Sequence, residues 1–274
     1  MQPTVMNFSL NYPGPRLTWT FRPQHTSKGN CFVRIISMLS WYQEPVSWLA
    51  ECVSALSKIS DHVVAVDGPY WGFPGAVLKP ASGPEQADVI ARTAAGLGMG
   101  CTIHAPRKPW SGPNGGEVAK RDWMMQAAML VAEPGDWLLR VDADEVFTAV
   151  PGDVKQRLAE TDKHVAEVML WEREAEDSVN RVVDVGDDYE SPLRCLFRAI
   201  PGIRIEGAHF VVSAPVDGER RFLVGHNTVP AEPLWDVRLE HRTRLRSPGR
   251  KRLKNEYSPL INQFEKVEDT PRND

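Results

Sequence analysis

Short apolar runs alternate with segments of helical periodicity through the first half of the chain. The apolar runs are residues 31–38 (CFVRIISM), 62–66 (HVVAV), 101–105 (CTIHA) and 137–141 (WLLRV). Residues 45–56, 85–97 and 117–131 lie between them and carry apolar residues at helical spacing. Strands that alternate with helices form βαβ units and a mostly parallel sheet covered by helices. The sequence therefore predicts an α/β, Rossmann-like fold.

The pattern changes after residue 145. A helix is expected at 153–160, and strands at 165–171, 194–197 and 203–205 are expected to form a small antiparallel extension. The last segment is strongly charged, and we expect a helix near 250–264. We divide the chain into an irregular leader (1–30), an α/β core (31–215) and a basic C-terminal extension (216–274) packed on that core.

Composition excludes several classes of protein. The 274 residues carry a formal net charge of -4, which gives no global attraction to nucleic acid or anionic lipid. No apolar run approaches the roughly 20 residues that a membrane span needs, and the start of the chain does not resemble a secretory signal. The four cysteines are scattered without C-x-x-C spacing, which predicts reduced core residues and a cytoplasmic protein.

The fourth apolar run ends on acidic residues. Asp142, Ala143, Asp144 and Glu145 follow it directly, and ligands of α/β sheets bind at the carboxyl ends of the strands. Two carboxylates spaced i and i+2 at such a place repel each other unless a cation lies between them. Oxygen ligands suit Mg²⁺ or Mn²⁺, and Mg²⁺ is commonly held together with substrate phosphates. The pattern favours a metal site for Asp142 and Asp144.

Several segments in the same order resemble family 2 glycosyltransferases, particularly the lipopolysaccharide-core and phage-encoded branches. Residues 135–145 (GDWLLRVDADE) resemble the D-x-D segment of that family. Residues 40–44 (SWYQE) stand where the family has an N-E-E-like loop, and 64–68 (VAVDG) resemble V-V-D-D-G-S, with Pro69 in place of Ser. Residues 115–122 (GGEVAKRD) resemble G-x-x-x-A-R-N, with Asp122 for Asn. Residues 194–198 and 207–209 resemble its R-L-F-R and G-x-H elements.

The resemblance spans residues 31–212 and implies a GT-A fold, a UDP- or GDP-linked sugar donor, and Mn²⁺ or Mg²⁺. It implies that Asp144 ligates the metal, with Asp142 and His209 as further contacts and His241 as an alternative to His209. The resemblance also implies a set of donor-binding residues, and the phosphate-binding chemistry of basic side chains supports its two cations. The set is Ser40, Glu44, Asp67, Lys120, Arg121, Asp142 and Ala143.

Glycosyl transfer with inversion needs a carboxylate that takes the acceptor proton. The candidates lie in residues 171–177 (WEREAED), and we assign Glu172 and Glu174. If neither points into the site, a retaining mechanism is favoured. The acceptor is open: it could be DNA, a protein or a glycan. A polyanion such as DNA would bind the basic run of residues 238–254, which contains Arg238, Arg242, Arg244, Arg246, Arg250, Lys251, Arg252 and Lys254.

Two other functions fit part of the pattern. A nucleotidyltransferase shares the α/β fold and acidic metal site, but it usually has a Gly-rich loop with a basic residue after the first strand, where this chain has residues 39–44 (LSWYQE). A catalytically inactive nucleotide- or DNA-binding module is the non-enzymatic alternative, because Pro69 and Asp122 depart from the family pattern.

Overall fold

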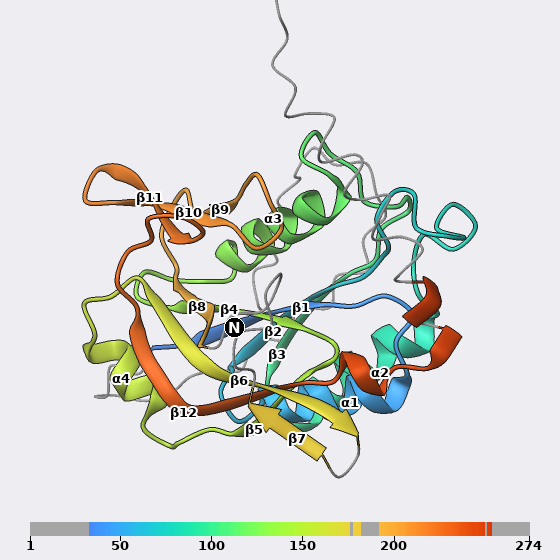
Figure 1. The fold of residues 1–274 in the computed structure, drawn as a ribbon, viewed down its shortest axis with the longest axis horizontal. Coiled ribbons are helices and arrows are strands. Elements are labelled where there is room, and N and C mark those ends of the chain that lie inside the picture. Colours follow the sequence, from blue (N-terminus) through green and yellow to red (C-terminus); the bar gives the residue numbers. More distant parts are fainter. Residues whose placement is uncertain (1–32, 176–177, 182–191, 250, 254–274) are drawn as a thin grey trace, which may run out of the picture.

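The first half of the molecule is a regular alternation of strands and helices. The structure, a computed structural model, describes residues 33–175, 178–181, 192–249 and 251–253 (Figure 1). The elements of this half are β1 (Ile35–Ser40), α1 (Val46–Leu56), β2 (His62–Val66), α2 (Pro84–Gly96), β3 (Gly100–His104), α3 (Gly116–Met129) and β4 (Trp137–Asp142).

The second half consists mainly of strands. Its elements are β5 (Glu145–Ala149), α4 (Val154–Glu160), β6 (Val165–Ala175), β7 (Ser178–Arg181), β8 (Leu193–Arg198), β9 (Arg204–Ile205), β10 (Val212–Val216), β11 (Glu219–Val224), β12 (Glu232–His241) and the 3₁₀ helix η1 (Thr243–Leu245).

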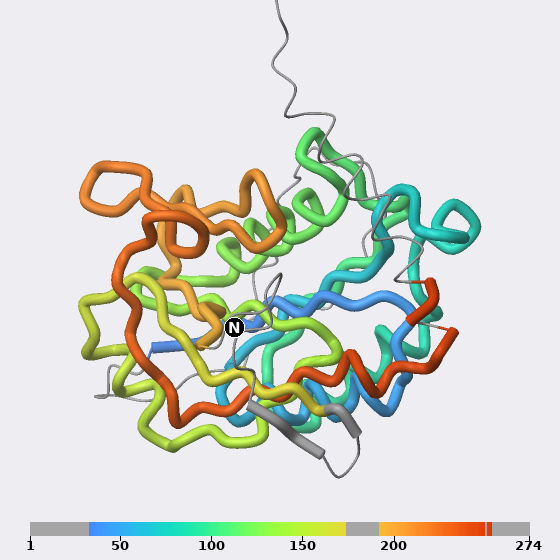
Figure 2. The backbone as a smooth tube through the Cα atoms, in the orientation of Figure 1, coloured from blue at the N-terminus to red at the C-terminus, as the bar shows by residue number. Residues whose placement is uncertain are grey.

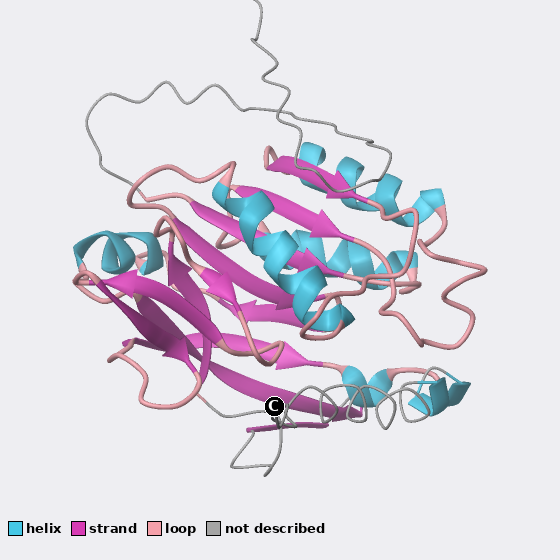
Figure 3. Ribbon diagram, turned by 90° about the horizontal axis from the view of Figure 1, so that it is seen from above, coloured by secondary structure: helices cyan, strands magenta, loops and turns pink. Residues whose placement is uncertain are grey.

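One large mixed sheet organises the fold. Its strand order is β3-β2-β1-β4-β8-β6-β12-β5, with β7 paired to β6. The four strands β3, β2, β1 and β4 are parallel, whereas β8 runs antiparallel to both β4 and β6. The sheet curls, and helices pack against it (Figure 3). This is an α/β fold compatible with the expected Rossmann-like class.

The two faces of the sheet bury different sets of side chains. Successive residues of a strand point to opposite faces. In β1, Ile35 and Leu39 therefore join the core under α1, α2 and α4, while Ile36 and Met38 join the core under α3. The small sheet β11-β10-β9 closes this second core beside α3 (Figure 1).

The C-terminal part of the described chain belongs to the large sheet. β12 lies between β6 and β5, although more than 50 residues of sequence separate it from either strand (Figure 2). This strand was not predicted from the sequence, and residues 232–241 were expected in a basic extension packed on the core. Residues 232–241 (EPLWDVRLEH) form a strand that leaves several of its side chains exposed, and its charged residues made the segment resemble a surface extension.

The predicted elements of the first half are found within a few residues of their expected ends. The first strand differs most, since it starts at Ile35 and runs to Ser40, and residues 31 and 32 lie outside the described part. The leader (1–30) and most of the helix expected at 250–264 also lie outside it. The strands β5, β10 and β11 were not predicted, because they are short and carry polar residues on exposed faces.

Two expectations about the whole chain can be compared with the described residues. Cys52, Cys101 and Cys195 are buried free thiols, as expected, and Cys31 lies outside the described part. Among the helices that the structure describes, none has the length and apolar character that crossing a bilayer requires.

Candidate functional site

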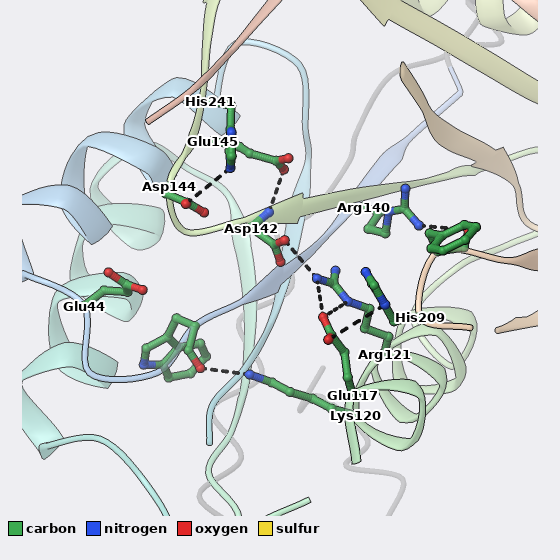
Figure 4. A network of polar contacts seen from close by, with 12 residues as sticks. Glu44, Glu117, Lys120, Arg121, Arg140, Asp142, Asp144, Glu145, His209 and His241 are labelled. Atoms are coloured by element: carbon green, nitrogen blue, oxygen red, sulfur yellow. Dashed lines mark hydrogen bonds and ion pairs between the residues drawn. The ribbon is translucent and has the colours of Figure 1, made fainter. Parts of the chain in front are cut away.

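The candidate site lies at the carboxyl end of β4, where the parallel strands end together. Ser40 at the end of β1 pairs in register with Asp142 at the end of β4. The turn from β4 to β5 contains Ala143 and Asp144, and the Ala143 N–H donates to the Ser40 carbonyl at 3.1 Å. This backbone bond fixes the position from which the acidic side chains leave the sheet (Figure 4).

Asp142 belongs to an ion-pair group on the α3 side of the sheet. Arg121 of α3 donates from Nη2 to Asp142 Oδ2 at 2.9 Å and to Glu117 Oε1 at 3.0 Å. Burial raises the pKa of Asp142, but the Arg121 guanidinium outweighs it and holds that pKa below its usual value. His209 Nδ1 lies 3.9 Å from Glu117 Oε2. We call Glu117, Arg121, Arg140, Asp142 and His209 the arginine cluster.

Asp144 belongs to a second group on the other side of the β4 end. His241, the last residue of β12, places Nδ1 2.8 Å from Glu172 Oε2 and Nε2 3.4 Å from Asp144 Oδ2. Arg246 Nη2 lies 2.7 Å from Glu44 Oε1 and 3.3 Å from Asp144 Oδ2. We call Glu44, Asp144, Glu172, His241 and Arg246 the histidine cluster.

His241 is held as a cation in this cluster. Burial disfavours the charged ring, but the hydrogen bonds to Asp144 and Glu172 outweigh it and raise the pKa of His241 to about 10. The ring is thus positioned from both nitrogens. A histidine fixed by a carboxylate at one nitrogen and directed at the site by the other is the usual arrangement around metal ligands.

Glu145 joins the two clusters. Its Oε2 accepts a hydrogen bond from the Asp142 backbone N–H at 2.8 Å (Figure 4). Burial and the neighbouring charge of Asp142 raise the pKa of Glu145 to about 7. From the sequence, Glu145 belonged to the acidic centre but had no role. In the structure its carboxylate fixes the backbone N–H of Asp142.

Lys120 is a buried structural cation in this state of the protein. Its exposed fraction is only 2%. Its Nζ donates to the carbonyl oxygens of Trp41 at 2.9 Å and Gly68 at 3.0 Å. Burial lowers the pKa of Lys120 to about 8. Lys120 therefore ties α3 to the loops that follow β1 and β2, and its amine does not face the ion pairs of Asp142 and Asp144.

Asp67 follows β2 and fixes its own loop. Its carboxylate accepts hydrogen bonds from the N–H and the hydroxyl of Ser82 and from the Gly68 N–H, each at 2.6 Å. Burial raises its pKa, although these bonds oppose the shift. The structure therefore places Asp67 at the expected strand end but with its carboxylate engaged in the loop of residues 67–82.

The two residues assigned as candidate bases lie in β6. Glu172 contacts His241, and its Oε1 lies 3.7 Å from Arg244 Nε. It therefore belongs to the histidine cluster. The side chain of Glu174 and residues 176–177 lie outside what the structure describes.

The basic run of residues 238–254 is largely occupied by ion pairs within the protein. Arg238 packs over the Trp171 ring at 4.1 Å and contacts Glu240 at 3.3 Å. Arg242 contacts Glu51 at 2.7 Å. These contacts do not support the expected free surface for a polyanion. Lys251 and Arg252 are exposed, and Arg250 and Lys254 lie outside the described residues.

The expected metal ligands are not gathered into one set. His209 lies in the arginine cluster beside Glu117, whereas His241, the alternative, contacts Asp144. Within the described part of the chain, no three side chains of His, Cys, Asp or Glu are grouped to hold a metal ion. Asp144 offers an oxygen, and the adjacent His241 Nε2 would offer a nitrogen once a bound cation displaces its proton. This pair fits a cation that is held jointly with substrate phosphates and water, as Mg²⁺ commonly is.

Comparison with known proteins assigns no family. No family model matches the sequence, and no curated protein is similar to it.

Three important side chains were missed from the sequence or received no role. Glu117 lies four residues before Arg121 on α3, a spacing that signals a helical ion pair. Arg246 contacts Glu44 across 202 residues, and no local pattern predicts such a contact. Arg140 lies inside an apolar strand, and its isolation there was the available signal.

Proposed function

We propose that this protein is a metal-dependent glycosyltransferase of the GT-A type that transfers a hexosyl or pentosyl group from a UDP- or GDP-linked donor. The observation that carries the proposal is the pair Asp142 and Asp144 at the end of β4, next to the ends of the parallel strands β1 and β2. Carboxylates at this edge of an α/β sheet suit a cation and a nucleotide diphosphate.

Asp144 would hold Mn²⁺ or Mg²⁺, together with His241 after its Nε2 proton has been released to solvent. The cation would neutralise the charge that develops on the leaving diphosphate. Glu172 acts on His241 through its 2.8 Å contact with Nδ1, so we assign it as a positioning residue. Glu174 then remains the candidate base for an inverting reaction.

Arg246 is a second cation beside Asp144, at 3.3 Å, in addition to His241 at 3.4 Å. Its contacts with Glu44 and Asp144 balance the charges of the two carboxylates. A diphosphate offers the guanidinium an alternative bidentate partner. Arg246 is therefore assigned to the donor side together with Glu44.

The buried reduced cysteines favour a cytoplasmic setting.

The test is calorimetric titration of the full chain with UDP and GDP, each with and without Mn²⁺. We expect one nucleotide to bind, with affinity increased by Mn²⁺. Asp144→Asn should reduce the increase in nucleotide affinity that Mn²⁺ causes by at least about tenfold. Asp236→Asn is the matched control, because Asp236 is an exposed carboxylate of the neighbouring β12 that pairs with Arg157.

Two results would contradict the proposal. If neither nucleotide binds in the presence of Mn²⁺, the donor site is wrong. If Asp144→Asn and Asp236→Asn bind equally well, the metal assignment is wrong. Turnover is followed by mass spectrometry of candidate DNA, protein and glycan acceptors, with Glu174→Gln expected to lose transfer and to keep nucleotide affinity.

A further inference from the structure

Arg140 is a half-buried cation on the strand of the candidate site. Among the described residues, no carboxylate lies within ion-pair distance of it. Its guanidinium makes one hydrogen bond, from Nη1 to the Phe210 carbonyl at 3.3 Å, and lies 5.9 Å from the centroid of the Phe197 ring. A guanidinium has five N–H donors. Most of its hydrogen-bonding capacity therefore meets no acceptor in the described part of the protein.

The surroundings of Arg140 disfavour its charge. Burial, and then the positive charge of Arg121, lower the pKa of Arg140, although the charges of Glu145 and Asp142 oppose the shift. A charge that is partly removed from water without an ionic partner destabilises the fold. Residues that are kept at such a cost to stability are commonly functional.

The position of Arg140 directs it toward the site. Residues two apart on a strand share a face, so Arg140 points to the same side of β4 as Asp142. Figure 4 shows Arg140, Arg121 and His209 in one region, reached from β4, from α3 and from the loop between β9 and β10.

The neighbours of Arg140 differ in what they can still bind. Arg121 is engaged by Glu117 and Asp142. His209 keeps 33% of its side chain exposed, and its ring carries at least one N–H donor whether it is neutral or charged. A ligand anion would therefore meet Arg140 as its main partner and His209 as its second.

We propose that Arg140 and His209 bind an oxyanion, a phosphate or carboxylate group, that the substrate carries. The Cα atoms of Arg140 and Asp142 are about 7 Å apart along the strand, so the anion would bind on the same face as the donor diphosphate but at separate side chains. The site itself follows from Arg140, but its assignment to the transferred sugar or to the acceptor rests on the proposed function.

The first experiment detects the site directly in the full chain without metal. The ¹⁵N signal of the Arg140 Nε–H group is identified by its loss in Arg140→Lys. It is then followed during titration with inorganic phosphate and with glucuronate. We expect a saturable shift with at least one of them. No response to either anion through the millimolar range would overturn the proposal.

Variants test whether Arg140 carries the affinity. Calorimetry should show at least tenfold weaker anion binding for Arg140→Met and an intermediate value for Arg140→Lys, which keeps the charge but not the planar fork. Arg204→Met is the matched control, because Arg204 is half-exposed and pairs with Glu206 on the adjacent small sheet. Equal anion affinity in wild type and Arg140→Met would overturn the proposal.

Stability separates binding from a structural role. If Arg140 is retained for a ligand, Arg140→Met should melt at or above the wild-type temperature. A lower melting temperature together with unchanged anion affinity would assign Arg140 to the fold and overturn the proposal. Should Arg140→Met fail to fold, His209→Ala and Arg140→Lys supply the same affinity comparison.

The source of the anion is found by comparing UDP-glucose with UDP-glucuronate in the presence of Mn²⁺. Tighter binding of the glucuronate donor in wild type, lost in Arg140→Met, assigns the site to the transferred sugar. If the two donors bind equally well and phosphate still binds in the presence of UDP-glucose, the oxyanion site is assigned to the acceptor. If no nucleotide binds, the proposed function fails, and the metal-free phosphate titration still decides the oxyanion site.

Discussion

The imidazole of His241 lies between the carboxylates of Glu172 and Asp144, with Nδ1 2.8 Å from the former and Nε2 3.4 Å from the latter. The three residues come from β12, β6 and the turn after β4. The His241 side chain is only 3% exposed. Its orientation is therefore set by these two carboxylates and not by solvent.

Replacing Glu172 by Gln should weaken the binding of Mn²⁺ with nucleotide. The variant keeps the shape of the side chain but removes the charge that orients His241. Loss of such a supporting carboxylate commonly reduces metal affinity about 10- to 100-fold. The affinity for Mn²⁺ in the presence of the bound nucleotide is measured by calorimetry. Glu167→Gln, on the same strand but paired with Arg194, serves as the control, and equal losses in both variants would refute the positioning role.

Replacing Arg121 by Met should strongly destabilise the protein. The variant leaves the buried carboxylates of Glu117 and Asp142 without their shared guanidinium. Removing one partner of a buried ion pair destabilises by about 3–5 kcal/mol. Urea denaturation measures the change in the free energy of unfolding. The double variant Arg121→Met with Glu117→Gln should recover part of the loss, whereas additive losses would show that Arg121 and Glu117 are not coupled.

His104 should make stability depend on pH between about 4 and 6.5. Its ring lies 4.1 Å from the Trp123 ring and 5.6 Å from the Trp110 ring, and burial lowers its pKa from 6.5 to about 4. The unfolded chain binds this proton at higher pH than the folded chain does. The stabilisation is therefore complete above pH 6.5 and is lost as the pH falls toward 4.

The comparison is between wild type and His104→Phe. Urea denaturation at pH 7 and pH 4.5 gives the loss of stability of each protein over this range. That loss should be smaller in the variant by about 1–3 kcal/mol, allowing for partial solvation of the ring. Since all other titrating groups are shared, equal losses in the two proteins would show that His104 does not contribute.

Replacing Gly68 by Ala should destabilise the loop after β2. Gly68 has φ +103°, and a Cβ there would overlap Pro106 Cγ and lie 3.1 Å from the Pro80 carbonyl oxygen. We expect a loss of about 2–4 kcal/mol, from backbone strain and overpacking together. Gly96→Ala is the control, because Gly96 ends α2 with open space around it. Thermal denaturation should show a fall in melting temperature for Gly68→Ala only.

The sequence was most informative where structure depends on neighbouring residues. The strand His62–Val66 starts and ends where the apolar run predicted, because a buried parallel strand is a continuous apolar run. The strand-end position of Asp67 and Asp142 followed from the same runs. The turn at Asp67 and Gly68 also follows from local backbone preferences, since Gly68 has a positive φ.

The roles of the polar residues could not be obtained in this way. The sequence placed Lys120 and Arg121 together as phosphate-binding cations, yet the helix turns their side chains to different partners. Lys120 bonds two carbonyl oxygens and Arg121 bonds two carboxylates. His209 and His241 were likewise ranked by resemblance, and the structure places only His241 beside Asp144.

The sequence by itself determined the βαβ half of the fold and the strand end that carries Asp142 and Asp144. Those features depend on periodicities within a few residues of one another. The tertiary structure decided that β12 enters the sheet beside β6 and that Arg246 reaches Glu44 across 202 residues. Contacts of this kind depend on how distant strands pair and on which buried charges need partners, and local sequence patterns contain neither.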